Sequence, residues 1–209
     1  MQIAFIGYGE LGRQIHSLIQ QASSAGEAIF FDDNLWQEKK ANAFPFEAYE
    51  DDLYKNYSFI VSLGYKQLPA KQKTIRRLDE LGRNIYSFIH PSCFVNSSAV
   101  IENGVVAYPM CNIDKDVKIR KGVLLNNSVT ISHNTTIEDC CYVSPGAILS
   151  GNVTVGENTF IGAGVIVANN INIGKNVIIG IGTVVTQDIG DNSSVIGNPM
   201  KFVNRLHLE

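Results

Sequence analysis

A repeat of six residues constrains this chain more than any other feature. Steps of six from Val95 to Val185 meet sixteen positions, of which fifteen are Val, Ile or Leu and one is Ala107. Four residues after each of these positions comes a second small or β-branched residue, from Ala99 to Ile189. Gly, Asn, Asp, Ser and Lys collect between the two sets. The two apolar sets therefore predict side chains that share one buried core.

A period of six fits neither a helix, with its period of 3.6, nor an extended strand, with its period of 2. It fits a short strand and a corner, repeated, which is typical of a parallel β-helix. Three such blocks would close one triangular coil, so each aliphatic side chain stacks on its equivalent about 18 residues later. The alternative is a half-buried antiparallel sandwich with chance spacing, and a register held from Val95 to Ile189 argues against it.

Composition narrows the class of protein. Charged residues make up 18% of the 209 residues and the net charge is −3, which does not favour a nucleic-acid or membrane surface. No apolar run approaches the ~20 residues of a membrane span. The start, MQIAFIGYGELG, lacks the features of a secretory signal, so we expect a cytoplasmic, soluble protein. The four cysteines show no metal-ligand spacing, which predicts reduced structural thiols and no metal site.

A glycine-rich turn follows the first apolar run of the chain. Residues 2–6 predict a strand that ends at Gly7-Tyr8-Gly9-Glu10-Leu11-Gly12, and an amphipathic helix should follow. Glycines allow close approach of the backbone, and a helix N-terminus offers N–H groups to a phosphate. A second strand, 28–31, runs into Asp32 and Asp33, where such folds hold a ribose or a base. This pattern predicts a nucleotide-binding βαβ unit.

The size of this unit limits what it can bind. A strand at 59–63, a helix at 69–81 and a strand at 84–89 complete about 90 residues before the repeat begins. That is about one mononucleotide-binding half of a dinucleotide fold, so one nucleotide and its diphosphate would fit. The predicted domains are a Rossmann-like α/β domain at 1–90 and an all-β parallel β-helix at 91–209. A degenerate βαβ cap without a ligand is the alternative.

One histidine lies inside the repeat. His133 alone could be a structural corner residue, but Gly151 follows it 18 residues later, one predicted coil above. A glycine there leaves room and a bare backbone N–H beside the imidazole. A base beside a bare amide suits acyl transfer, because one group removes a proton and the other binds the oxyanion.

Several motifs together resemble a known family. They are GYGELG, FFDDN, VSLG with a basic helix after it, FIHPSCFV, LLNNSVTISHNTTIEDCCYVSPGAILSG and VIGNPMKFV, and they span essentially the whole chain. The repeat resembles the left-handed β-helix acyltransferases. The order of the two domains is similar to the nucleotide-aminosugar N-acetyltransferases of the bacillosamine and perosamine type and to the related sialic-acid acetyltransferases.

This resemblance implies a homotrimer with active sites between neighbouring β-helices, and a role in surface polysaccharide or glycan biosynthesis. It implies transfer of an acetyl group from acetyl-CoA to the C4 amine of a dTDP- or UDP-linked 4-amino-4,6-dideoxyhexose. His133 matches the general base, and Gly151 matches the amide that faces the acetyl carbonyl. Asn126 matches an Asn near the reacting sugar.

The resemblance also implies the binding residues. For the nucleotide sugar they are Gly9, Glu10, Leu11, Asp32, Asp33, Gly64, Tyr65 and Lys66. For the coenzyme they are Tyr142, Gly151, Ala163 and Ile181. Two positions depart from the family pattern. Asn134 stands where relatives have an acidic partner of the base, so it could orient the ring but supplies no charge. Tyr142 stands where several relatives have a histidine.

Three other functions are alternatives to a sugar N-acetyltransferase. A sugar O-acetyltransferase needs similar machinery and is the nearest rival. A zinc-dependent carbonic anhydrase on the same fold needs three histidines at the subunit interface, and only His133 is available in each chain. A non-catalytic nucleotide-sugar-binding protein would tolerate replacement of His133.

Overall fold

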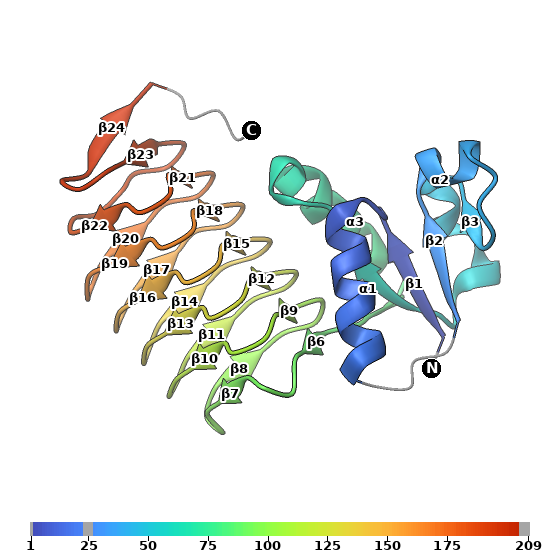
Figure 1. The fold of residues 1–209 in the computed structure, drawn as a ribbon, viewed down its shortest axis with the longest axis horizontal. Coiled ribbons are helices and arrows are strands. Elements are labelled where there is room, and N and C mark those ends of the chain that lie inside the picture. Colours follow the sequence, from blue (N-terminus) through green and yellow to red (C-terminus); the bar gives the residue numbers. More distant parts are fainter. Residues whose placement is uncertain (1, 23–26, 205–209) are drawn as a thin grey trace. The chain divides into compact units, whose positions relative to one another are not determined.

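The computed structural model describes residues 2–22 and 27–204 of the chain. The chain divides into two compact units, Met1–Phe88 and Ile89–Glu209. The first is an α/β unit and the second is a β-solenoid, and both can be followed in Figure 1. Among the described residues, no helix is both long enough and apolar enough to cross a bilayer.

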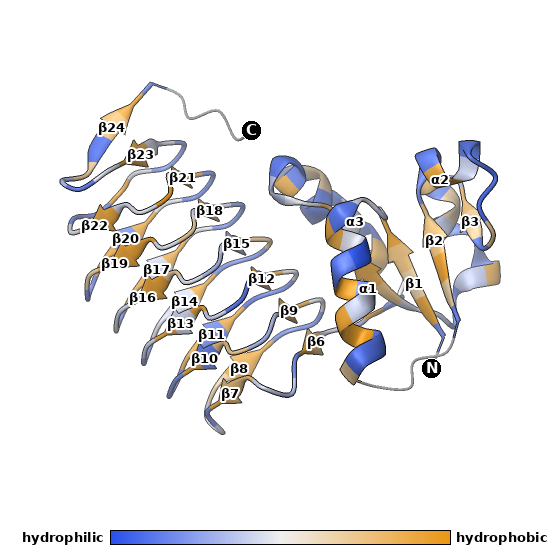
Figure 2. Cartoon of the chain, viewed as in Figure 1, coloured by the Kyte–Doolittle hydropathy of each residue, from blue (hydrophilic) through white to orange (hydrophobic). Residues whose placement is uncertain are grey.

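A five-stranded parallel sheet forms the centre of the first unit. Its strand order is β3-β2-β1-β4-β5. The strands are β1 (Ile3–Ile6), β2 (Ala28–Phe31), β3 (Ala43–Phe44), β4 (Ser58–Val61) and β5 (Asn84–Ile85). Every residue of β1 and β4 is buried, as expected for parallel strands covered on both faces. β1 is strongly hydrophobic in Figure 2.

Helices connect the strands of this sheet. The α-helices are α1 (Glu10–Ala22), α2 (Asp33–Gln37) and α3 (Leu68–Glu80), and the 3₁₀ helices are η1 (Phe46–Glu50), η2 (Asp52–Tyr54) and η3 (Tyr65–Gln67). α1 carries apolar and polar stripes along its length (Figure 2), and it buries Gly12, Ile15 and Ile19. These spacings place the three residues on one face of the helix.

The second unit is a β-solenoid with three sheets, whose strands are parallel except for β24, which pairs antiparallel with β23. The sheet orders are β22-β19-β16-β13-β10-β7, β20-β17-β14-β11-β8 and β24-β23-β21-β18-β15-β12-β9-β6. Successive coils pair residues 18 apart, as in Leu125 with Val143 and Ile131 with Leu149. The predicted parallel β-helix architecture is therefore confirmed.

The solenoid strands are short and evenly spaced. They are β6 (Phe88–Ile89), β7 (Phe94–Val95), β8 (Val100–Ile101), β9 (Val106–Ala107), β10 (Asn112–Ile113), β11 (Lys118–Ile119), β12 (Leu124–Leu125), β13 (Thr130–Ile131), β14 (Thr136–Ile137), β15 (Tyr142–Val143), β16 (Ile148–Leu149), β17 (Thr154–Val155), β18 (Phe160–Ile161), β19 (Ile166–Val167), β20 (Asn172–Ile173), β21 (Ile178–Ile179), β22 (Val184–Val185), β23 (Ser194–Ile196) and β24 (Lys201–Val203).

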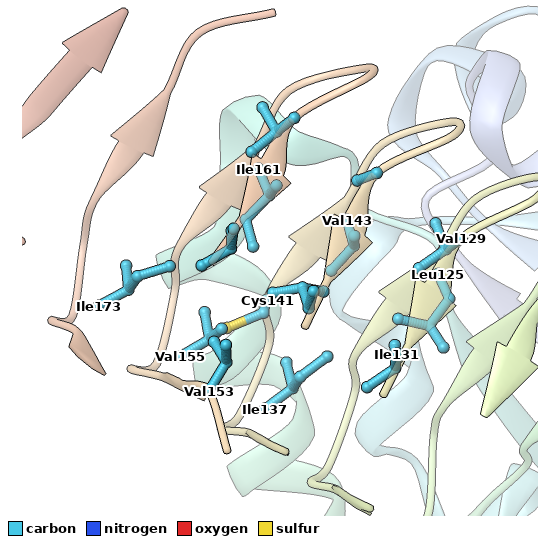
Figure 3. Packing of buried hydrophobic residues seen from close by; sticks show 14 of the residues in the cluster. Leu125, Val129, Ile131, Ile137, Cys141, Val143, Val153, Val155, Ile161 and Ile173 are labelled. Carbon is cyan, nitrogen blue, oxygen red and sulfur yellow. The ribbon is translucent and has the colours of Figure 1, made fainter. Parts of the chain in front are cut away.

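Both apolar sets of the repeat point into one core. Leu125, Ile131, Ile137 and Val143 are fully buried, and Figure 3 shows them with their neighbours inside the coils. Cys141, from the second set, lies among them. Stacking of like side chains excludes water along the solenoid, which is why the sequence keeps an aliphatic residue at every sixth position.

Asparagines at the corners adopt a left-handed backbone conformation. Asn134, Asn152 and Asn170 have φ values of 59°, 59° and 61°. Asparagine tolerates this region better than most residues that carry a side chain. The polar positions of the repeat therefore mark the points where the chain turns.

Two expectations about element boundaries were wrong. Residues 84–89 form two strands in different sheets, β5 and β6, rather than one. Beyond Val185 the last coil is two residues shorter, because Ile189 pairs with Ile173 and β23 pairs with β21 at a separation of 16 residues. Ile189 therefore takes the place of a strand residue rather than that of the second apolar set.

Candidate functional site

A cavity of about 630 Å³ lies at the carboxyl ends of β1, β2 and β4. Parallel strands bring these ends to one edge of the sheet, where ligands of such sheets bind. The cavity is lined by all eight residues that were expected to hold the nucleotide sugar in this unit: Gly9, Glu10, Leu11, Asp32, Asp33, Gly64, Tyr65 and Lys66. Six further residues that were not expected to bind the nucleotide sugar also line the cavity: Gly7, Asn34, Phe46, Ser62, Leu63 and Gln67.

The glycines around this cavity fall into two kinds. Gly7 has φ +78°, and a Cβ added to Gly12 would lie 2.9 Å from the Gly7 carbonyl oxygen, so the turn and the packing of α1 require both. A Cβ added to Gly9 or Gly64 would meet nothing within 4 Å, and neither residue has a left-handed φ. The fold itself therefore gives no steric reason for glycine at positions 9 and 64.

The two aspartates after β2 already accept backbone hydrogen bonds. Asp32 accepts from Tyr8 N at 2.8 Å through Oδ2, and its Oδ1 caps α2 by accepting from Asn34 N and Leu35 N. Asp33 Oδ1 accepts from Phe46 N at 2.8 Å. Asp32 thus holds the glycine turn against α2, a structural role that the sequence analysis missed, while Asp33 is exposed at the cavity.

An aromatic pair lies next to the glycine turn. The Tyr8 hydroxyl and His16 Nδ1 are 2.6 Å apart, and both rings pack against Phe30. Burial raises the pKa of Tyr8, which Arg13 partly offsets, and burial lowers the pKa of His16. The neutral forms of both side chains are therefore favoured beneath the turn.

In the second unit, His133 lies directly against Gly151. A Cβ added to Gly151 would be 2.5 Å from Cε1 and 2.6 Å from Nε2 of the imidazole. The ring thus fills the space that any side chain at position 151 would need. His133 and Gly151 each follow a strand by two residues, β13 and β16, so consecutive coils bring them together.

Asn134 contacts the imidazole through its carboxamide. Its Nδ2 lies 3.3 Å from His133 Nδ1 and donates to Asn152 Oδ1 at 3.1 Å, and Asn152 Nδ2 donates in turn to Asn170 Oδ1 at 3.1 Å. Because an amide nitrogen only donates, Nδ1 accepts, and the proton of the neutral ring then lies on Nε2. Asn134, Asn152 and Asn170 form a ladder of side-chain hydrogen bonds that ends at the imidazole.

The backbone N–H of Gly151 is not bare, contrary to expectation. It donates to Asn169 Oδ1 at 2.9 Å, 18 residues further along the chain. Asn169 was not among the predicted site residues, because in the sequence it resembles the other polar corner residues. The available signal was its position, since His133, Gly151 and Asn169 are spaced by one coil each.

The remaining expected residues of this unit lie in two other places. Asn126 Nδ2 donates to the Tyr142 hydroxyl at 3.1 Å, and both residues are buried. The Tyr142 ring packs on Phe160 with ring centres 5.7 Å apart. Ala163 and Ile181 stand one coil apart, joined by a backbone bond from Gly182 N to Ala163 O, and Ile181 is 72% exposed.

Glu138 and Asp139 follow His133 in the sequence and could have replaced the missing charge, but their contacts lie elsewhere. Glu138 Oε2 is 3.8 Å from Arg120 Nε. Burial and then the charge of Glu102 raise the pKa of Asp139. Across residues 2–22 and 27–204, no cluster of three or more His, Cys, Asp or Glu side chains could hold a metal ion.

The sequence matches no protein-family model and no curated protein. Solved structures match it over almost its full length. The acetyltransferase domain of PglB from Neisseria gonorrhoeae, also solved in complex with acetyl coenzyme A, is 28% identical, with a TM-score of 0.86 over 97% of this chain and 99% of that chain. PerB from Caulobacter crescentus, in complex with CoA and GDP-perosamine, is 25% identical, with a TM-score of 0.89 over 98% of each chain.

A third structure, WeeI from Acinetobacter baumannii AYE, is 20% identical, with a TM-score of 0.86 over 97% of this chain and all of that chain. At that identity the likeness concerns the fold. The three structures share both parts of the chain, the α/β unit and the solenoid. The resemblance to sugar N-acetyltransferases of the hexapeptide-repeat superfamily, expected from the motifs, is confirmed.

Proposed function

We propose that this protein is an acetyl-CoA-dependent sugar N-acetyltransferase of the hexapeptide-repeat superfamily, with a Rossmann-like first unit and a left-handed solenoid. The likeness to an acetyltransferase domain solved with acetyl coenzyme A supports the acyl donor. The contact of the His133 imidazole with the Gly151 backbone carries the proposal, because it places a side chain that can act as a base against a stretch of backbone without a side chain, as acyl transfer requires.

The proposed acceptor is the C4 amine of a dTDP- or UDP-linked 4-amino-4,6-dideoxyhexose. The cavity at the ends of β1, β2 and β4 would hold the nucleotide. Gly9 and Gly64 support this role, because open space beyond both Cα atoms lets a diphosphate approach the backbone. Asp33, at the cavity with Oδ1 bound to Phe46 N, would accept from the base or the ribose through Oδ2.

In the proposed reaction the amine nitrogen attacks the thioester carbonyl and a C–N bond forms. The carbonyl π electrons move to oxygen, and His133 takes the proton that the amine loses. When the oxyanion collapses, the C–S bond breaks, and the thiolate of coenzyme A receives the proton from the imidazolium. Asn126 would contact the sugar, whereas Tyr142, Ala163 and Ile181 would line the coenzyme path.

His133 acts as a base through Nε2 only when the proton of the neutral ring is on Nδ1. The observed contact from Asn134 Nδ2 favours the other tautomer. Rotation of the Asn134 carboxamide presents Oδ1 to the Nδ1–H, and Asn152 and Asn170 have the same choice of two orientations. The ladder therefore replaces the acidic partner of the family with a neutral group that can hold either tautomer.

We further propose a cytoplasmic homotrimer with active sites between neighbouring subunits. The exposure of Ile181 and of outward-facing Ile148 and Ile166 in the isolated chain supports this assembly, because subunit contacts would cover these apolar side chains. Sedimentation equilibrium of the purified protein would test it, and a monomer at assay concentration with full activity would refute it.

A thiol-release assay with acetyl-CoA tests the proposed reaction. The acceptors are dTDP-, UDP- and GDP-linked 4-amino-4,6-dideoxyhexoses, and His133→Ala is assayed beside the unchanged protein. Turnover of one acceptor that is lost in His133→Ala supports the proposal. Binding of the sugars without turnover would instead support a binding protein. Turnover of the corresponding 4-hydroxy sugars alone, assayed beside the amines, would support an O-acetyltransferase. Turnover that survives in His133→Ala would refute the role of His133.

A further inference from the structure

Three residues in consecutive coils meet at one corner of the solenoid. His133, Gly151 and Asn169 each lie two residues after a strand of the same sheet, β13, β16 and β19. Adjacent strands in a sheet are about 4.8 Å apart, so Gly151 lies between an imidazole on one side and a carboxamide on the other. The imidazole contacts the Gly151 Cα face, and the carboxamide accepts from its N–H at 2.9 Å.

This hydrogen bond fixes which end of the Asn169 carboxamide is engaged. Oδ1 accepts from Gly151 N, so Nδ2 and its two hydrogens form the other branch of the same planar group. The Asn169 side chain is exposed rather than packed into the core. The hydrogen bond from Gly151 N polarises the carboxamide, so that Asn169 Nδ2 becomes a stronger hydrogen-bond donor at this corner in place of the Gly151 N–H.

We propose that Asn169 is a catalytic residue, whose Nδ2–H donates to the thioester carbonyl oxygen as negative charge develops there. The proposal rests on the acetyl transfer argued above. As the amine attacks, the π electrons of the carbonyl move to its oxygen, and Nδ2–H stabilises this oxyanion until the C–S bond breaks. Gly151 N–H positions the carboxamide instead of contacting the substrate itself.

Two substitutions separate this role from a purely structural one. Asn169→Asp keeps an oxygen to accept from Gly151 N but has no N–H to donate, and its charge opposes an oxyanion. Asn169→Ala removes both functions and leaves Gly151 N–H open to the substrate. Gln187→Ala is the matched control, because Gln187 follows β22 by two residues as Asn169 follows β19.

Steady-state kinetics with acetyl-CoA and the accepted sugar measure the effect. We expect kcat to fall at least about 100-fold in both Asn169 variants, with the KM for acetyl-CoA changed only a few-fold, because the donor acts mainly in the transition state. Gln187→Ala should keep the kcat of the unchanged protein. Circular dichroism and thermal melting would verify that all three variants fold.

Two results would overturn the inference. An unchanged kcat in Asn169→Asp would show that Asn169 has a structural role at this corner and does not donate to the substrate. Asn169→Ala with unchanged or higher kcat would mean that Gly151 N–H binds the oxyanion and that Asn169 merely covers it. Failure of the acetyl transfer itself would look different, since the unchanged protein would then show no turnover, or His133→Ala would keep it.

Discussion

Replacement of Gly151 by Ala separates activity from stability. The added Cβ would lie 2.5 Å from His133 Cε1, whereas ordinary contact begins at 3.4 Å. The imidazole must therefore move by about 0.9 Å. A misplacement of about 1 Å costs roughly 100-fold in rate, which corresponds to about 2.7 kcal/mol in activation free energy.

The same substitution should leave the fold intact. Gly151 does not have a left-handed φ, and the atoms in its way belong to an exposed side chain that can rotate. Replacement of Gly by Ala at a compatible position stabilises proteins by about 0.4–1 kcal/mol through the unfolded state. We therefore expect an unchanged or slightly higher Tm together with the loss of kcat/KM.

The thiol-release assay and a thermal melt would measure both effects. Gly190→Ala is the matched control, because its Cβ would meet nothing within 4 Å and its φ is also not left-handed. The double variant His133→Ala, Gly151→Ala should be no slower than His133→Ala alone, since both changes act on one imidazole. If Gly151→Ala keeps kcat/KM within threefold, the contact does not serve catalysis.

Three further predictions concern other parts of the molecule. Gly9→Val should leave Tm unchanged, because the space beyond Gly9 is open, but should raise the KM for the nucleotide sugar at least about tenfold; an unchanged KM would remove Gly9 from the site. Asn134→Asp places a charge about 3.3 Å from His133 Nδ1, worth about 1.3 kcal/mol in water-like surroundings. Because the added carboxylate favours the protonated imidazole, the acidic limb of the pH profile of kcat/KM should move to higher pH by about one unit. An unchanged acidic limb would show that the residue at position 134 only orients the ring. The Cys111 hydrogen bond lowers the pKa of half-buried Cys93 to about 7, so iodoacetamide should label Cys93 first, increasingly as pH rises through 7; labelling of another cysteine first would contradict this.

The solenoid could be predicted from the sequence because its signal is redundant. Every sixth residue had to be aliphatic, so a single exception such as Ala107 did not obscure the pattern. The end of the repeat was harder to place. Ile189 suits either apolar position of a coil, and only pairing with Ile173 shows that the last coil is two residues shorter.

The candidate site was predictable to a lesser degree. The spacing of 18 residues indicated that His133 and Gly151 would meet, and the structure brings them into contact. Asn169, one coil further, could not be distinguished in the same way, because asparagine is common at the corners of the repeat. For the same reason nothing in the sequence distinguished Asn152 and Asn170, so the ladder of hydrogen bonds that they form with Asn134 could not be predicted.

The separation of 18 residues between the coils that carry His133, Gly151 and Asn169 also limits how this chain can change in length. A whole coil gained or lost after Asn169 would preserve the stacking of the core and would leave the corner of His133, Gly151 and Asn169 untouched. A single residue gained between His133 and Gly151 would change the separation of 18 residues that places Gly151 against the imidazole. A change of whole coils beyond β19 would therefore leave this corner intact, while a change in the interval of 18 residues that joins Gly151 to Asn169 would break its hydrogen bond.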